Sequence, residues 1–119
     1  MFKKVGSKRD IVIINLEEFQ IQTTQDALDL MATMRYEAGC EKLILKEHHL
    51  VDRFFDLKSG LAGDILQKFV NYQIKLAVIG NFERYSSKAL HDFIYECNKG
   101  KHLFFVSSET SAVQMLENA

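Results

Sequence analysis

The sequence predicts an α/β fold, in which four main helices cover a mixed, mostly parallel sheet of about five strands in two or three layers. Two observations predict it. From residue 24 onward, amphipathic segments with helical spacing alternate with short runs that are apolar throughout. Before residue 24, two apolar runs flank a glycine turn, which indicates a β-hairpin. Alternating strands and helices form a parallel sheet because right-handed crossovers return each strand beside its neighbour, and the hairpin adds an antiparallel edge.

The first elements have clear local signals. Thr23 and Asp26 have the spacing of a capping box, and Gly39 is a typical C-terminal stop for a helix. The second apolar run is hydrophobic on both faces, which indicates a buried strand. We therefore expect a strand at 2–5, a strand at 11–15 and a helix at 24–38.

The later elements follow the same alternation. The next strand, at 43–45, leads into an irregular stretch, after which a helix begins at Lys58 or Ser59 and presents an apolar face that includes Ile65 and Phe69. Gly100 is expected to close the following helix. The remaining elements are expected as strands at 75–79 and 103–106 and helices at 87–98 and 109–116.

Composition limits the class of protein. The chain has 119 residues, no proline and no low-complexity segment, so we expect a single domain spanning 1–119. The 15 Lys and Arg balance 16 Asp and Glu, and this net charge of −1 argues against nucleic acid or an anionic membrane as partner. No apolar segment suits a signal peptide or membrane span, so a cytoplasmic location is expected. Cys40 and Cys97 form no CxxC motif and are predicted to be reduced, partly buried thiols.

The best candidate site lies at the carboxyl ends of the parallel strands, where ligands and partners usually meet such a sheet. We call this edge the carboxyl rim: it comprises the loops at 47–60, 80–87 and 107–108. Three helices are expected to begin there. The rim is rich in hydroxyl and amide groups, from Ser59, Asn81, Ser86, Ser87, Ser107 and Ser108, with Asp56 and Arg84 beside them.

A structural interpretation competes with each of these serines, because Ser and Asn are preferred N-caps in any protein. Gly80 alternatively ends a strand tightly. Gly60 and Gly63 do not form a GxGxxG fingerprint, and no P-loop motif follows any strand. The sequence therefore predicts no cofactor.

Aromatic residues are mostly explained by core packing, with one exception in the loop after the strand at 75–79. Phe82 and Tyr85 flank Arg84 in that loop. If they are exposed, this trio resembles a partner-binding hot spot.

The histidines suggest metal binding or catalysis only weakly. His48 and His49 lie beside Glu47 and Asp52, but adjacent histidines are expected to point apart and no metal-ligand spacing accompanies them. We interpret both as solvated loop residues. His91 with Ser59 lacks the G-x-S-x-G context of a hydrolase, so the sequence predicts no catalytic residues. This favours a protein that is not an enzyme and leaves an enzyme as the alternative.

Two resemblances follow from these residues. The element order and the run from Leu43 through Asp56 to Ser59-Gly60-Leu61 resemble the STAS domain of anti-anti-sigma factors. In that family, the serine before the glycine is the regulatory phosphorylation site, which implies phosphorylation of Ser59. Two residues separate Asp56 from Ser59, where the family usually has one.

Over nearly its whole length, the chain more closely resembles DUF4180, a bacterial family of small cytosolic proteins of unknown function. The residues that carry this likeness are FFDLKSGLAGDILQKF at 54–69, KLAVIGNF at 75–82, SKAL at 87–90 and DFIYECNKG at 92–100. Threonine is common in that family where Ser59 stands, and aspartate where Asn81 stands. The resemblance implies a fold but no substrate.

These observations favour a regulatory or protein-interaction module, with a phosphate carried or bound at Ser59 and Gly60 and a protein partner docking near Phe82. The alternative is a small-ligand-binding protein or an enzyme that uses the same rim. A deep pocket joining Ser59 and Asn81 with His48 or His49 would favour that alternative, whereas a flat rim would favour docking. The hairpin edge is a further candidate, for pairing in a homodimer.

Overall fold

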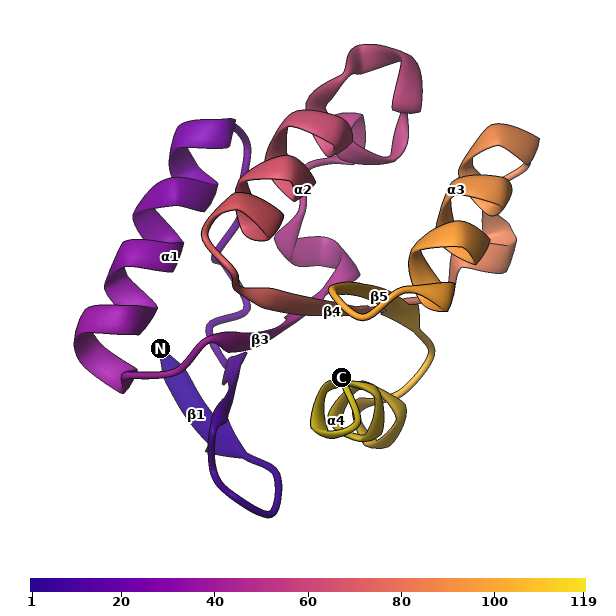
Figure 1. Ribbon diagram of the computed structural model, residues 1–119. Helices are drawn as coiled ribbons and strands as arrows, with labels where there is room; N and C mark the ends of the chain where they lie inside the picture. The colour runs from indigo at the N-terminus through magenta and orange to yellow at the C-terminus, as the bar shows by residue number, and fades with distance from the viewer.

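Five strands form one sheet in the computed structural model, which describes residues 1–119. The strands lie in sequence order across the sheet, β1-β2-β3-β4-β5 (Figure 1). β1 is antiparallel to β2, and every other neighbouring pair is parallel. The prediction of a mostly parallel sheet with an antiparallel edge is confirmed. The strands are β1 (Phe2–Val5), β2 (Ile11–Ile14), β3 (Lys42–Lys46), β4 (Lys75–Ile79) and β5 (Leu103–Val106).

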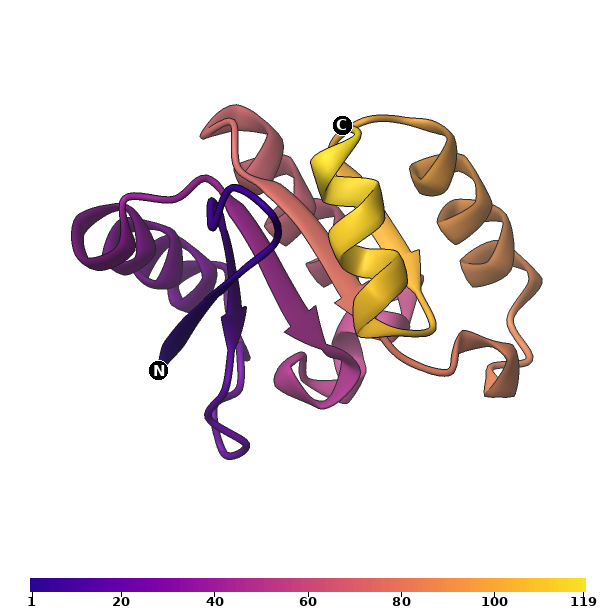
Figure 2. The same cartoon turned by 90° about the horizontal axis from the view of Figure 1, so that it is seen from below.

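Four helices cover the sheet unequally. They are α1 (Thr24–Ala38), α2 (Leu61–Asn71), α3 (Lys88–Lys99) and α4 (Glu109–Glu117). Because the strand order never reverses, right-handed crossovers place α1, α2 and α3 on the same face. α4 follows the last strand and packs on the opposite face, against β4 and β5 (Figures 1 and 2). The molecule therefore has three layers at the β4–β5 end.

The core is divided by the sheet. Both faces of β2 are buried, which explains why its sequence is apolar throughout. Val12 and Ile14 pack under the three helices, whereas Ile11 and Ile13 pack on the side of α4. The larger cluster, on the three-helix face, contains 23 buried residues and the smaller one contains 7. Most of the apolar burial therefore lies on the face covered by α1, α2 and α3.

Local signals set the ends of α1 as expected. The Thr23 hydroxyl accepts a hydrogen bond from the Asp26 N–H at 3.1 Å, and the Asp26 carboxylate accepts one from the Thr23 N–H at 3.2 Å. Gly39 follows the helix with a φ of 65°, in the left-handed region that glycine adopts without strain. The predicted capping box and stop are both confirmed.

The start of α2 differs from the prediction. The chain forms three short 3₁₀ turns before it, η1 (Glu47–His49), η2 (Asp52–Phe55) and η3 (Leu57–Ser59). Gly60 then adopts a φ of 79°, and the helix begins only at Leu61. Lys58 and Ser59 therefore lie in the preceding turn, because a left-handed residue cannot continue a right-handed helix.

Two further expectations concern the cysteines and the membrane. Cys40 and Cys97 are both free, the first buried and the second half-buried, as predicted. Burial raises the pKa of the Cys97 thiol to about 11. None of the helices has the length and apolar character needed to cross a bilayer.

Candidate functional site

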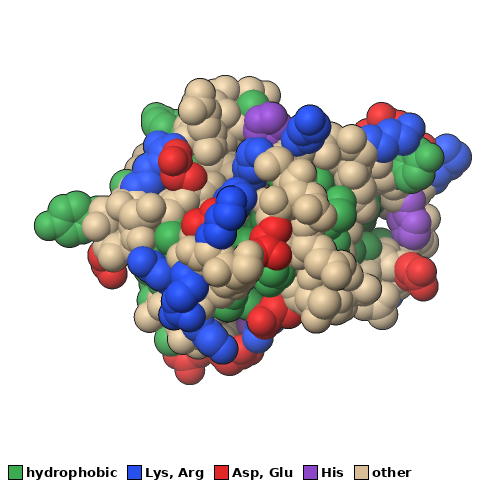
Figure 3. Space-filling model, turned by 60° about the horizontal axis from the view of Figure 1, so that its bottom comes forward, with side chains coloured by type: hydrophobic (Ala, Val, Ile, Leu, Met, Phe, Trp, Pro, Cys, Tyr) green, Lys and Arg blue, Asp and Glu red, His purple; other side chains and the backbone are tan.

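An open groove lies at the β5 edge of the sheet, on the carboxyl rim. The loop after β4 leads to α3 on one face, whereas the loop after β5 leads to α4 on the other. The two helices diverge around the edge strand and leave a groove of about 940 Å³ between them. Figure 3 shows it as a furrow with hydrophobic side chains inside, between the main body and the lobe on the right. We call it the α3–α4 groove.

The α3–α4 groove has an apolar base and a polar margin. Its base is formed by Phe82, Ile94, Phe105, Val106 and Met115, which are buried or half-buried. Its margin carries exposed polar side chains from both helices and both loops: Asn81, Glu83, His91, Ser107 and Gln114. An apolar centre surrounded by polar groups is the usual anatomy of a binding surface.

Asn98 closes the free edge of β5. Its side-chain oxygen accepts a hydrogen bond from the Phe105 N–H at 2.8 Å, and its side-chain nitrogen donates to the Phe105 carbonyl at 3.1 Å. The carboxamide thus replaces a neighbouring strand at this residue. An edge strand with unpaired main-chain groups invites pairing with another chain, and Asn98 removes that opportunity at Phe105. Sequence reasoning missed Asn98, because nothing local marks a helical Asn as a partner for a later strand.

Phe82 and Tyr85 face inward. η4 (Phe82–Arg84) places the Phe82 ring against Phe105, with ring centroids 5.4 Å apart. The Tyr85 ring stacks on Phe55 at 5.2 Å, and Phe55 also contacts Phe82 at 6.0 Å. Both side chains are half-buried, so the condition attached to the hot-spot interpretation, exposure, is not met. Their rings instead connect the groove to the turn that carries Phe55.

Glu47 joins the first two loops of the carboxyl rim. Its carboxylate accepts hydrogen bonds from the Asn81 N–H at 3.1 Å and from the Arg84 guanidinium and the Tyr85 hydroxyl. Burial, together with the Glu47 carboxylate, raises the pKa of Tyr85 to about 12. Sequence reasoning gave Glu47 no role of its own. The signal that could have revealed its role is the position of Glu47 directly after a buried strand, from which a carboxylate reaches the next loop.

Gly80 is required by this arrangement. A Cβ on Gly80 would stand 2.6 Å from Glu47 Oε1 and 2.8 Å from Glu47 Cβ. Such distances do not occur between real atoms, so any side chain would displace Glu47. Gly80 thus allows the close approach of two loops, in addition to ending β4.

Ser59 acts as a clasp for the turn before α2. Its hydroxyl lies 2.9 Å from the Arg53 carbonyl and 2.8 Å from the Asp56 carbonyl, to which it donates. The same oxygen accepts a hydrogen bond from the Leu61 N–H at 3.2 Å, and the side chain is exposed. Asp56 accepts from the Lys58 N–H at 3.2 Å. Ser59 lies outside the groove, as does Gly60.

The other rim serines have different roles. Ser87 and Ser108 cap α3 and α4 by accepting from the N–H groups of Leu90 and Ser111, both at 3.1 Å, as their structural interpretation predicts. Ser107 lies on the margin of the groove. Ser86 is exposed and makes no hydrogen bond through its side chain. Among the predicted residues, the groove therefore gathers only Asn81, Phe82 and Ser107.

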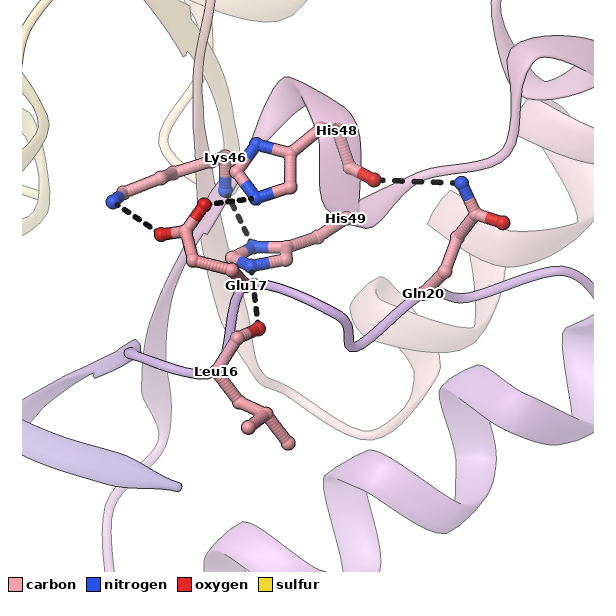
Figure 4. A network of polar contacts seen from close by, with 6 residues as sticks. All are labelled: Leu16, Glu17, Gln20, Lys46, His48 and His49. Carbon is pink, nitrogen blue, oxygen red and sulfur yellow. Dashed lines mark hydrogen bonds and ion pairs between the residues drawn. The ribbon is translucent and has the colours of Figure 1, made fainter.

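His49 corrects the interpretation of the histidines as solvated loop residues. Its side chain is completely buried, and Figure 4 shows it at the centre of a polar network. Nδ1 accepts a hydrogen bond from the Lys46 N–H at 3.0 Å, and Nε2 lies 3.2 Å from the Leu16 carbonyl, to which it donates. This pair of bonds requires the neutral ring. Burial and the neighbouring His48 lower the pKa of His49 accordingly.

The two adjacent rings also do not point apart as expected. Their centroids are 4.3 Å apart, because both residues belong to the tight turn η1 rather than to an extended segment. His48 Nε2 lies 3.1 Å from Glu17, which also meets the Lys46 ammonium at 3.4 Å (Figure 4). The cluster ties the segment after β2 to the segment after β3.

No catalytic arrangement is assembled from the predicted groups. No hydrogen bond joins Ser59 to His91, whose Nε2 lies 2.6 Å from the Tyr85 carbonyl. No group of three His, Cys, Asp or Glu side chains is placed to hold a metal ion. His48, His49 and Ser59 lie outside the α3–α4 groove, so this groove does not join them to Asn81.

The fold and the groove define a small α/β domain with a mixed five-stranded sheet and an open site at one sheet edge. The chain belongs to the family described as "Domain of unknown function (DUF4180)", whose model matches residues 6–116. Comparison with curated proteins and with solved structures finds no match.

Proposed function

We propose that this protein is a regulatory protein-interaction module, similar to STAS domains, in which a phosphate on Ser59 changes how a partner docks at the carboxyl rim. The observation that carries the proposal is the clasp formed by the Ser59 hydroxyl. It holds the Arg53 and Asp56 carbonyls on either side of Phe55. Phe55 in turn supports Phe82 and Tyr85 on the rim.

A phosphate at Ser59 acts on this clasp in two ways. Esterification removes the hydroxyl hydrogen, so the donor to both carbonyls is lost. The group also adds a charge of about −1.5 to −2 near Asp56, while the N-terminus of α2 offers N–H groups that attract it. The phosphate therefore lies against the N-terminus of α2 and no longer holds the turn before it. Opening the turn moves Phe55, and with it the rings of Phe82 and Tyr85 that contact Phe55.

The STAS resemblance supports the same assignment. That resemblance implies a strand, a loop with Asp56 and then Ser59-Gly60-Leu61 before a helix. The proposal draws on the position of Ser59 in η3, between β3 and α2, two residues before α2 begins at Leu61. Ser59 is exposed, so a kinase has access to its hydroxyl. A cytoplasmic setting is part of this proposal.

Ser59→Asp tests the regulatory step, with Ser86→Asp as the matched control. Ser86 is an exposed rim serine without a side-chain hydrogen bond, so Ser86→Asp adds the same charge without breaking a hydrogen bond of the protein. We expect Ser59→Asp to shift the amide NMR signals of Phe82 and Tyr85, and the control to leave the Phe55 turn unchanged. Phosphopeptide mass spectrometry of the native protein should detect phosphate on Ser59. An unmodified Ser59, with wild-type partner binding by Ser59→Asp, would contradict the proposal.

A small-ligand function is the second candidate, and the groove volume is what favours it. About 940 Å³ lies at the upper end of the range for ligand pockets, which is roughly 300–1,000 Å³. Its polar margin is exposed rather than enclosed, however, which suits a partner segment better.

A homodimer through the hairpin is less favoured by the edge itself. Lys3 and Lys4 are exposed on β1, the free edge strand on that side of the sheet. Charged side chains on an edge strand oppose pairing with a second copy.

A further inference from the structure

The α3–α4 groove has a charge pattern that selects among partners. Its lining contains no Lys or Arg and one acidic side chain, Glu83; the one histidine, His91, lies with Nε2 2.6 Å from the Tyr85 carbonyl. A lining without Lys or Arg lacks the side chains that usually neutralise a phosphate, a nucleic acid or an acidic peptide. It repels such groups through Glu83 and accepts neutral or basic ones.

Free hydrogen-bonding groups face the groove from two sides. Three exposed side chains on the margin of the groove make no hydrogen bond within the protein. They are the carboxamides of Asn81 and Gln114 and the hydroxyl of Ser107. A carboxamide offers both a donor and an acceptor, which matches one peptide unit. Asn98 shows this match inside the same groove, where it pairs with both main-chain groups of Phe105.

Asn98 also restricts how a peptide can bind in the groove. Asn98 occupies the main-chain groups of Phe105 at the edge of β5, so a peptide does not extend the sheet there. It lies instead against side chains, between α3 and α4. The apolar base then receives a side chain, with Phe82 and Phe105 meeting edge to face at 5.4 Å and Met115, a flexible residue that adapts to different shapes, across from them.

We infer that the α3–α4 groove binds an extended segment of a partner protein, one that carries a large apolar residue and lacks acidic residues. The apolar side chain fills the base, and the carboxamides of Asn81 and Gln114 bind the main chain on either side of it. This inference rests on the proposed function in that both require a protein partner, and it adds where that partner binds and what its chemistry is.

A random linear-peptide library selected on the immobilised full chain tests the inference. We expect selected peptides to share a large apolar residue and to be depleted in Asp and Glu. In titrations followed by amide NMR, their contacts should map to Asn81, Phe105 and Met115. A library of neutral heterocyclic fragments, run in parallel, covers the small-ligand alternative.

Two groove variants and one control sharpen the result. We expect Gln114→Ala and Met115→Ala each to weaken a selected peptide by about tenfold. Thr110→Ala, an exposed change on α4 that does not line the groove, should leave affinity unchanged. Thermal melting of each variant separates lost binding from lost folding.

Several outcomes would overturn the inference: no peptide selected, peptides that map elsewhere, enrichment of acidic residues, or fragments that bind the groove while peptides do not. The wild-type chain tests the groove without any phosphate. If a peptide binds it and Ser59→Asp leaves that affinity unchanged, the groove assignment stands and the proposed regulation fails. If no peptide binds but Ser59→Asp still alters the NMR signals of the rim, the groove assignment fails and the proposed regulation stands.

Discussion

α1 and α3 cover the same face of one sheet, yet they are held very differently. α1 buries Ala27, Leu30, Met31 and Met34 and packs beside α2. α3 buries only Leu90 and packs chiefly on the edge strand β5, at the end of the row of helices (Figure 1). Both helices have capped N-termini, so the difference comes from their neighbours. A helix at a sheet edge leaves part of its apolar face accessible, and segments that bind are drawn from such weakly held regions.

Truncation of one buried side chain in each helix should give the largest contrast. Met34 is fully buried, so Met34→Ala is expected to lower the free energy of unfolding by roughly 2–5 kcal/mol. Ile94 on α3 is half-buried, and Ile94→Ala should cost only about 1 kcal/mol because part of its surface is already in water. Urea unfolding of both variants measures the difference. Equal losses would remove the distinction between the two helices.

Gly80 and Gly63 offer a matched pair for the close approach on the carboxyl rim. Gly80→Ala forces Glu47 away from the Asn81 N–H and is expected to cost roughly 1–3 kcal/mol. Gly63 lies within α2 with nothing within 4 Å of an added Cβ. Gly63→Ala should therefore stabilise the protein by up to about 1 kcal/mol. Thermal melts of the two variants should shift in opposite directions.

Asn98→Ala tests how the weaker end of the sheet is closed. Removing the carboxamide leaves the Phe105 N–H and carbonyl without partners, at a cost of about 1–2 kcal/mol. Hydrogen exchange at Phe105 should accelerate, while exchange in β3, at the centre of the sheet, should change much less. Asn98→Asp keeps an acceptor for the N–H and should protect that amide better than Asn98→Ala does. Unchanged exchange at Phe105 in both variants would show that Asn98 does not close the edge.

The smallest expected effect is the pH dependence of stability that His49 introduces. Its pKa in the folded protein lies below the ordinary value of 6.5, so the unfolded chain takes up a proton first as pH falls. The free energy of unfolding should therefore be constant above about pH 6.5 and decrease as pH falls from there toward the folded pKa. Urea titrations at several pH values measure this slope.

His49→Gln should flatten that slope, since glutamine does not titrate. His102→Gln, at an exposed histidine outside the polar network, is the matched control and should keep it. A slope that survives His49→Gln would assign the effect to other groups.

The elements that sequence predicted well are those with local signals. α1 runs from Thr24 to Ala38 as expected, and β4 and β5 have the expected bounds, because caps, glycine stops and apolar runs act within a few residues. The irregular stretch after β3 was harder. Its three short turns depend on the left-handed Gly60 and on the Ser59 clasp, and they delay α2 to Leu61.

The candidate site was only partly predictable. Asn81, Phe82 and Ser107 were placed on the carboxyl rim by strand order alone, and they line the groove. Gln114 and Met115 were missed because they lie on α4, whose packing on the opposite face follows from no local pattern. His49 was interpreted as solvated because a polar residue in a loop usually is, and its burial depends on Leu16 and Lys46.

The sequence by itself determined the order of strands and helices, the parallel sheet with its antiparallel edge, and the near absence of net charge. These properties follow from periodicity, capping and composition, which act over a few residues or over the whole chain. Only the tertiary structure decided that α4 crosses to the other face and leaves a groove beside α3, that Glu47 joins two loops over Gly80, and that His49 is buried. Each of these depends on contacts between residues far apart in the chain, where the order of residues does not specify distance.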